Sequence, residues 1–136
     1  MSQTTPDSTS FLLVEDDQTI AFATKTLLKM KLSDVEIDCA ATGQLAEDCI
    51  RKKTYDIILL DLGLPDMHGI ELAIYAKTNV KSRCVDTRIV VLSAHHTTEN
   101  FDHDQFKYVE RFISKPLTTQ WIDTLFGAAM LRQLSV

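Results

Sequence analysis

Short apolar runs alternate with longer amphipathic stretches along this chain, and the alternation restricts its fold more than any other feature of the sequence. The amphipathic stretches cover 18–32, 42–53, 69–80 and 118–134, and they repeat apolar residues at the spacing of one helical face. Strands that alternate with helices build βαβ units, so the sequence predicts an α/β domain with a parallel sheet. The runs expected to form strands are "SFLLVE" (10–15), "VEIDCA" (35–40), "YDIILL" (55–60), "RIVVLS" (88–93) and "YVERFIS" (108–114).

The residue pattern within each run predicts where its strand lies in the sheet. The runs at 10–15, 55–60 and 88–93 are continuously apolar, which is typical of central strands covered by helices on both faces. The runs at 35–40 and 108–114 alternate, which favours edge positions. We therefore expect the order 2-1-3-4-5 of a flavodoxin-like, doubly wound (βα)5 sandwich, although the order 2-3-1-4-5 fits the pattern as well. In the first order, a ligand would bind where the chain reverses direction between the first and third strands.

Candidate N-cap residues precede the predicted helices. Asp17, Thr42 and the threonines at 118–119 can accept hydrogen bonds from the unpaired N–H groups of a first helical turn. The residues expected on the broad apolar face of the first helix are Ile20, Ala23, Leu27, Leu28 and Met30.

The composition fits one domain and argues against several kinds of partner. The chain has 136 residues, 45% of them apolar, and we expect a polar tail over 1–9 and a single domain over 10–136. The net charge of −5 argues against binding to nucleic acid or to an anionic membrane surface. No apolar run reaches the roughly 18 residues of a membrane-spanning helix. The three widely spaced cysteines predict reduced thiols in a cytoplasmic protein, with Cys39 and Cys49 in the core.

Polar side chains gather where the predicted strands end. Because the carboxyl ends of parallel strands meet at one edge of a sheet, these side chains should lie close together. Neighbouring carboxylates repel, and a hard cation such as Mg²⁺ (or Mn²⁺) relieves the repulsion. A metal, a lysine and a hydroxyl together suit a phosphoryl group, for which Asp61 can be the nucleophile, giving an aspartyl phosphate. The residues in question are Glu15, Asp16, Asp61, Ser93 and Lys115.

Four segments, taken in order, resemble the response-regulator receiver domains of two-component signalling. The likeness runs from about residue 11 to residue 126, which is nearly the whole chain. Each segment alone would be a weak signal, whereas their order and spacing as a set are highly specific. The resemblance implies the flavodoxin-like fold and the function of a phosphorelay switch. The segments are "LLVEDD", "IILLDLGLPDMHGIEL", "VVLSA" and "FISKP".

The resemblance also implies a role for each matching residue. Asp61 would be the phosphoacceptor, and Ser93 and Lys115 would hold phosphoryl oxygens. Phe112 matches the aromatic switch position, and Asp17 is expected to be a helix cap rather than a ligand. The expected metal ligands are Glu15, Asp16, Asp61 and the backbone carbonyl of Gly63.

Partners follow from the same resemblance. The phosphoryl donor would be a phosphohistidine on a histidine kinase or on a histidine phosphotransfer domain. The domain would catalyse its own phosphorylation and dephosphorylation rather than act as an enzyme on other substrates, and His95 is expected to influence the hydrolysis. The surface of the fourth helix, fifth strand and fifth helix would change shape and carry a partner or homodimer contact. Few strong helix formers lie between 97 and 105, so this fourth helix is only weakly predicted.

Two other functions remain open from the sequence. A haloacid-dehalogenase-like phosphatase also uses an aspartate after a parallel strand together with Mg²⁺, but it needs an acid two positions later, where this chain has Gly63. A receiver-like interaction module that is never phosphorylated would share the fold, although such modules usually lack part of the acid and lysine set. The chain is expected to be either a stand-alone regulator or a piece of a larger protein, such as a hybrid histidine kinase.

Overall fold

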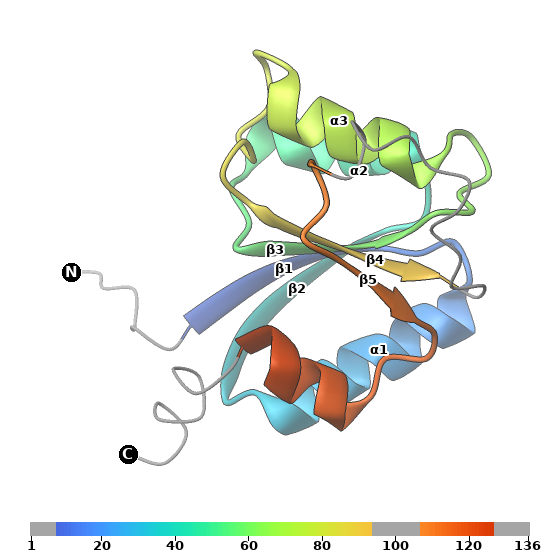
Figure 1. The fold of residues 1–136 in the computed structure, drawn as a ribbon, viewed down its shortest axis with the longest axis vertical. Coiled ribbons are helices and arrows are strands. Elements are labelled where there is room, and N and C mark those ends of the chain that lie inside the picture. The colour runs from blue at the N-terminus through green and yellow to red at the C-terminus, as the bar shows by residue number, and fades with distance from the viewer. Residues whose placement is uncertain (1–7, 94–106, 127–136) are drawn as a thin grey trace.

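A computed structural model describes residues 8–93 and 107–126 and contains a five-stranded parallel sheet (Figure 1). The strand order is β2-β1-β3-β4-β5, and every adjacent pair is parallel. This order confirms the flavodoxin-like arrangement predicted from the sequence and excludes the alternative 2-3-1-4-5. The strands are β1 (Ser8–Val14), β2 (Asp34–Ala40), β3 (Ile57–Asp61), β4 (Arg88–Ser93) and β5 (Arg111–Ser114).

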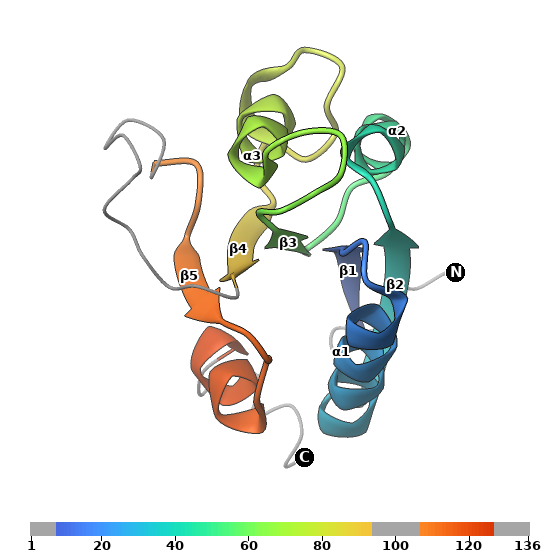
Figure 2. The same ribbon diagram turned by 90° about the vertical axis from the view of Figure 1, so that its right-hand side faces the viewer.

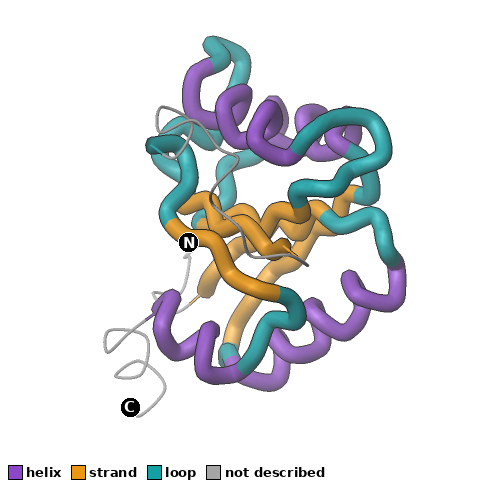
Figure 3. Tube along the Cα trace, turned by 45° about the vertical axis from the view of Figure 1, so that its right-hand side comes forward, coloured by secondary structure: helices purple, strands orange, loops and turns teal. Residues whose placement is uncertain are grey.

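Helices cover both faces of the sheet. Figures 1 and 2 show α2 and α3 on one face, and α1 with the helical segment 119–126 on the other. The tube in Figure 3 shows the same three layers, with the strands in the middle. The described residues therefore form the doubly wound sandwich expected from the alternating pattern. The helices are α1 (Gln18–Lys31), α2 (Gly43–Lys52), α3 (Gly69–Thr78) and the segment 119–126.

The central strand β3 supplies side chains to both layers. Ile58 and Leu60 belong to the hydrophobic cluster beneath α2 and α3, whereas Ile57 and Leu59 belong to the cluster beneath α1 and the segment 119–126. Every residue of β3 is buried. The continuous apolar run is explained by this position, because successive side chains of a strand covered on both faces enter two different cores.

Side-chain caps start the helices where the sequence predicted them. Asp17 Oδ1 accepts a hydrogen bond from Ile20 N at 3.0 Å, and Thr42 Oγ1 accepts one from Leu45 N at 3.1 Å. Thr118 Oγ1 accepts one from Trp121 N at 3.2 Å in the same way. Helix α3 has a capping box that the sequence pattern does not predict, because a histidine, His68, takes the place of the usual serine or threonine.

The cysteine prediction is wrong in part. Cys39 is exposed and Cys49 is half-buried, while Cys84, which the sequence did not single out, is buried. Cys39 lies on the edge strand β2, where it lines an open hollow beside α1 instead of being covered by it. The alternation in β2 correctly predicts which of its faces points towards α1. Cys39 lies near the end of this face, where α1 does not cover it.

Two further predictions differ from the structure. Residues 107–108 form a turn, and β5 begins at Arg111 rather than at 108. On α1, Ala23 and Met30 are exposed, whereas Thr24 and Leu28 are buried. The buried stripe of α1 is therefore narrower than expected and follows residues four positions apart, as one helical face requires.

Some expectations lie outside the described residues. They concern the tail over 1–7, the fourth helix and His95 within 94–106, and the last helix beyond 126. Strand β1 begins at Ser8, and the boundary between a tail over 1–9 and a domain over 10–136 stays a prediction. Within 8–93 and 107–126, no helix has both the length and the apolar character needed to span a membrane.

We expect the Leu59→Ala variant to lose about 2–5 kcal/mol of unfolding free energy, because it leaves a cavity beneath α1 in a fully buried strand. Urea unfolding followed by circular dichroism measures the loss. Val80→Ala is the matched control, since Val80 is exposed and should change the midpoint little. Equal midpoints for the two variants would contradict the two-sided burial of β3.

Candidate functional site

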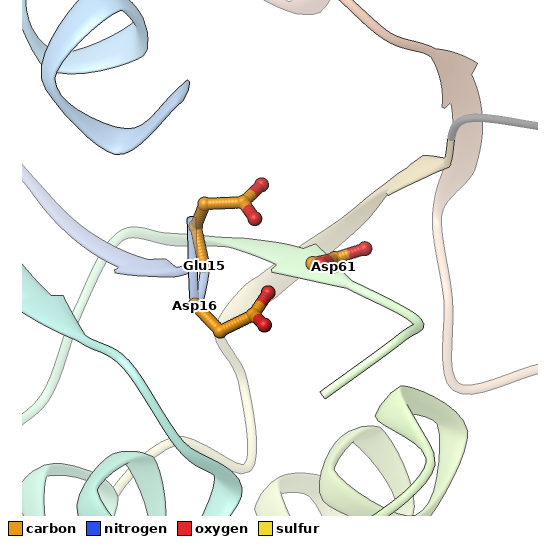
Figure 4. Close-up of side chains that lie close together, drawn as sticks. All are labelled: Glu15, Asp16 and Asp61. Atoms are coloured by element: carbon orange, nitrogen blue, oxygen red, sulfur yellow. The ribbon is translucent and has the colours of Figure 1, made fainter. Parts of the chain in front are cut away.

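Three carboxylates meet at the carboxyl end of the sheet. Glu15 and Asp16 directly follow β1, and Asp61 ends β3, which pairs with β1 in parallel. One carboxylate oxygen of each lies within 4.8 Å of the others (Figure 4). Glu15 is 5% exposed and Asp61 is 9% exposed, whereas Asp16 is open to solvent. The sequence prediction that these three residues converge is thus confirmed by the geometry.

A single lysine lies against two of these carboxylates. Lys115 Nζ is 2.8 Å from Glu15 Oε1 and 3.3 Å from Asp61 Oδ1. Lys115 follows β5, so its side chain crosses the end of β4 to reach residues at the ends of β1 and β3. Both contacts agree with the expected gathering of these side chains, although the sequence did not predict that Glu15 would be the nearer partner of Lys115.

Backbone groups fix the orientation of the acids. The amide of Asp17 donates to Glu15 Oε2 at 3.2 Å, and the amide of Gly63 donates to Asp61 Oδ1 at 3.2 Å. The N–H of Glu15 itself donates to the carbonyl of Ala40 at 3.0 Å, which ties the end of β1 to the end of β2. Bonds from backbone N–H groups limit the rotation of both carboxylates, and the bond from Asp17 favours the charged form of Glu15.

Burial and neighbouring charge act differently on the two ends of the Glu15–Lys115 pair. Burial is the largest influence on Glu15 and raises its pKa, although the hydrogen bonds from Lys115 and from the Asp17 amide oppose it. Burial also favours the neutral amine of Lys115, but the hydrogen bond and charge of Glu15, helped by Asp61, outweigh it and raise the pKa of Lys115. The lysine is therefore held as a cation, and the acids around it would be stabilised further by a second positive charge.

The other predicted residues lie at or beside this edge. Ser93 ends β4 one residue beyond Leu92, the register partner of Asp61, and its carbonyl accepts a hydrogen bond from Lys115 N at 2.8 Å. Gly63 is exposed in the loop after β3. Phe112 is half-buried in β5 and packs against the cluster beneath α2 and α3. Its role as a switch stays a prediction.

The donor set fits a hard divalent cation. All three converging side chains are carboxylates, and oxygen ligands of this kind suit Mg²⁺ or Mn²⁺. Three carboxylates and one ammonium carry two excess negative charges when all are ionised, which one divalent cation balances. The exposed side of Asp16 leaves room for the water molecules that Mg²⁺ usually keeps.

Comparison with known proteins places the chain in a family. The family model for the response regulator receiver domain matches residues 11–126, and the chain belongs to this family. It is therefore a receiver domain of the two-component signal-transduction type, as the resemblance in the sequence implied. Receiver domains are phosphoacceptors, and they generally bind Mg²⁺ through an acidic pocket.

Particular relatives agree with this class. The regulatory protein LuxO of Vibrio cholerae is 33% identical over 104 residues, which cover 76% of this chain and 22% of LuxO. The response regulator ArlR of Staphylococcus saprophyticus is 26% identical over 125 residues, which cover 92% of this chain and 54% of ArlR. The solved structure of the Francisella response regulator 1452 receiver domain aligns with a TM-score of 0.71 and 26% identity, covering 92% of this chain and 98% of that one. The chain spans about a fifth of LuxO and about half of ArlR.

We expect Asp16→Asn to weaken Mg²⁺ binding by about 10-fold or more, because the change removes one of the converging charges. Asp17→Asn should change Mg²⁺ binding little, since asparagine retains the oxygen that caps α1. Calorimetric titration with MgCl₂ compares the two. Equal losses for both variants would show that Asp16 is not distinguished from its neighbour as a ligand.

Proposed function

We propose that this domain is a phosphorelay switch in which Asp61 accepts a phosphoryl group from a phosphohistidine of a histidine kinase or of a histidine phosphotransfer domain. One observation carries the proposal. Asp61 ends a fully buried strand within reach of both an ammonium group and two further carboxylates. A carboxylate held in this way is fixed in position at the rim of the sheet, where a partner could approach it.

The proposed reaction is a direct transfer between two side chains. A carboxylate oxygen of Asp61 attacks phosphorus while the P–N bond to the donor imidazole breaks, and the imidazole nitrogen keeps the bonding electrons and takes up a proton from water. The product is an acyl phosphate on Asp61. Lys115 would neutralise charge on the phosphoryl oxygens, and the hydroxyl of Ser93 would donate a hydrogen bond to one of them.

Mg²⁺ (or Mn²⁺) would supply charge neutralisation and alignment of the phosphoryl oxygens during the transfer. The residues that would hold it are Glu15, Asp16, Asp61 and the backbone carbonyl of Gly63. The domain would then catalyse its own dephosphorylation when water attacks phosphorus. Among the described residues, no atom lies within 4 Å of a Cβ placed at Gly63, so they leave the space beside this loop position open.

Wild-type protein incubated with acetyl phosphate and Mg²⁺ should gain one phosphoryl group, and Asp61→Asn should gain none. Intact-mass spectrometry measures the gain, and its decay in the purified protein reports self-dephosphorylation. Asp86→Asn is the matched control, because Asp86 is exposed on the loop that precedes β4, at the opposite end of that strand from Ser93. Modification of the Asp61→Asn variant at the wild-type rate would rule out the proposal.

The two alternatives have less support. A haloacid-dehalogenase-like phosphatase would need an acid at the position of Gly63, which has no side chain. A module that is never phosphorylated would have no need to hold Glu15, Asp61 and Lys115 together at an energetic cost, since burying these charges away from water is unfavourable. Neither alternative accounts for the complete set.

The phosphodonor would dock beside α1. Phe22 is 72% exposed, and with Leu45 it lines a hollow of about 390 Å³ that also includes Glu15 of the acidic site. A donor that brings its imidazole to Asp61 must cover the rim of the sheet, so an apolar hollow continuous with that rim suits one helix of the donor. We therefore assign this hollow to the phosphodonor.

Replacing Phe22 with alanine should slow phosphotransfer from a cognate kinase or phosphotransfer domain by about 10-fold, while phosphorylation by acetyl phosphate stays unchanged. The cognate donor is identified first by profiling the wild type against the kinases of the source organism. Met30→Ala is the control, because Met30 is equally exposed on α1 but does not line the hollow. Similar losses for Phe22→Ala and Met30→Ala, or a loss with acetyl phosphate, would contradict the assignment.

The output of the switch would be a change in the surface around β5. Ser93 would move towards the phosphoryl group, and Phe112 would turn inwards into the vacated space, burying apolar area worth about 1–3 kcal/mol. A partner or a second copy of the domain would bind the changed surface. NMR shift mapping with and without beryllofluoride should show changes across residues 95–115, and changes confined to the Asp61 pocket would refute this proposal.

A further inference from the structure

We infer that Asp66 is a positioning residue that fixes the loop over 62–68 to the start of α2 and thereby sets the place of Gly63 beside Asp61. The inference rests on the proposed function in one respect, namely that the Gly63 carbonyl serves the metal. Asp66 itself does not belong to the converging acids around Asp61. Its contacts lie at the other end of the loop.

Both oxygens of Asp66 are used in the contact with α2. Oδ1 accepts a hydrogen bond from Gly43 N at 2.8 Å, and Oδ2 accepts one from Gln44 N at 2.9 Å. These two amides belong to the first turn of α2, where N–H groups have no partner within the helix. Two bonds to two successive amides fix both the position and the orientation of the carboxylate. In agreement, the amides of Gly43 and Gln44 lower the pKa of Asp66 and keep it ionised.

The helix does not depend on Asp66 alone for its cap. Thr42 Oγ1 accepts the hydrogen bond from Leu45 N, the next amide of the same turn. Thr42 caps the helix locally, whereas the hydrogen bonds to Asp66 link α2 to a loop 23 residues further along the chain. The close approach of Met67 supports this link, since a Cβ added at Gly43 would lie only 2.4 Å from the Met67 side chain.

The other end of the loop is closed next to Asp61. The N–H of Gly69 donates to the carbonyl of Leu62 at 3.0 Å, and Gly63 and His68 form an antiparallel bridge. A Cβ at Gly69 would lie 2.7 Å from the Asp61 carbonyl oxygen, a backbone atom that cannot give way easily. The base of the loop thus requires glycine at 69 and stays fixed to the end of β3.

Gly63 belongs to the base of the loop through its bridge with His68. Asp66 lies two residues before His68 and holds the tip of the same loop against α2, so the position of the Gly63 backbone depends on both contacts. Without Asp66 the base would remain, but the tip would lose both of its hydrogen bonds to α2. Supporting contacts of this kind orient metal ligands, and their loss typically costs about 10–100-fold in metal affinity.

The test is a titration of the purified chain with MgCl₂ by calorimetry, for the wild type, Asp66→Ala, Asp66→Asn and Thr42→Ala. We expect Asp66→Ala to raise the Mg²⁺ Kd by about 10-fold. Asp66→Asn should lie between Asp66→Ala and the wild type, because the amide retains one accepting oxygen although the charge is gone. Thr42→Ala should leave the Mg²⁺ Kd unchanged while weakening the same helix, which urea unfolding verifies.

In phosphorylation by acetyl phosphate, Asp66→Ala should need more Mg²⁺ for half-maximal rate and reach the wild-type rate at saturating Mg²⁺.

Three outcomes would overturn the inference. The first is a Mg²⁺ Kd that does not change in Asp66→Ala, and the second is a Kd that rises as much in Thr42→Ala as in Asp66→Ala. The third is an equal Kd for Asp66→Ala and Asp66→Asn, which would show that only the charge of Asp66 matters. The Mg²⁺ titration does not depend on phosphorylation. If the wild type binds Mg²⁺ but is not phosphorylated, the proposed function is wrong, and the role of Asp66 in Mg²⁺ binding can still be measured. A wild type that binds no Mg²⁺ would overturn both.

Discussion

The site depends on one lysine that lies between two buried carboxylates. Lys115 contacts Glu15 and Asp61, and neither acid could be held away from water without a cation beside it. The lysine does not balance all the charge, because the exposed Asp16 adds a third carboxylate to the cluster. The remaining negative charge favours a positive ligand, and a divalent cation would balance it. In the proposed function, a structural ion pair and a metal site would therefore share the same atoms.

The sheet makes this arrangement possible. Strands β1 and β3 are central and adjacent, so the acids that follow β1 emerge beside Asp61 at the end of β3. Helices cover both faces of these strands, which holds the strand ends rigidly. The apolar cores on both sides of the sheet therefore offset the free energy lost in burying the charged groups at its edge.

Much of this could be predicted from the sequence, for identifiable physical reasons. Continuous and alternating apolar runs distinguished the central from the edge strands, and parallel strand ends necessarily bring Glu15, Asp16 and Asp61 together. Contacts between segments that share no pattern were beyond reach. The Asp66 contact joins a loop to a helix start. The choice of Glu15 over Asp61 as the nearer partner of Lys115 depends on side-chain positions that residue patterns do not give. The exposure of Cys39 depends on how far α1 extends over β2, which residue alternation does not encode.

The central claim is that the phosphoryl group is carried as an acyl phosphate on Asp61. Borohydride cleaves an acyl phosphate and reduces the aspartyl carbonyl to an alcohol, so the modified aspartate becomes homoserine. The protein is phosphorylated with acetyl phosphate and Mg²⁺, reduced, digested and sequenced by tandem mass spectrometry. The account predicts homoserine at position 61 and at no other acid, and only in the phosphorylated sample. Homoserine at position 16 or the glutamate-derived alcohol 5-hydroxynorvaline at position 15 instead, or no reduction in a sample that carries phosphate, would contradict it.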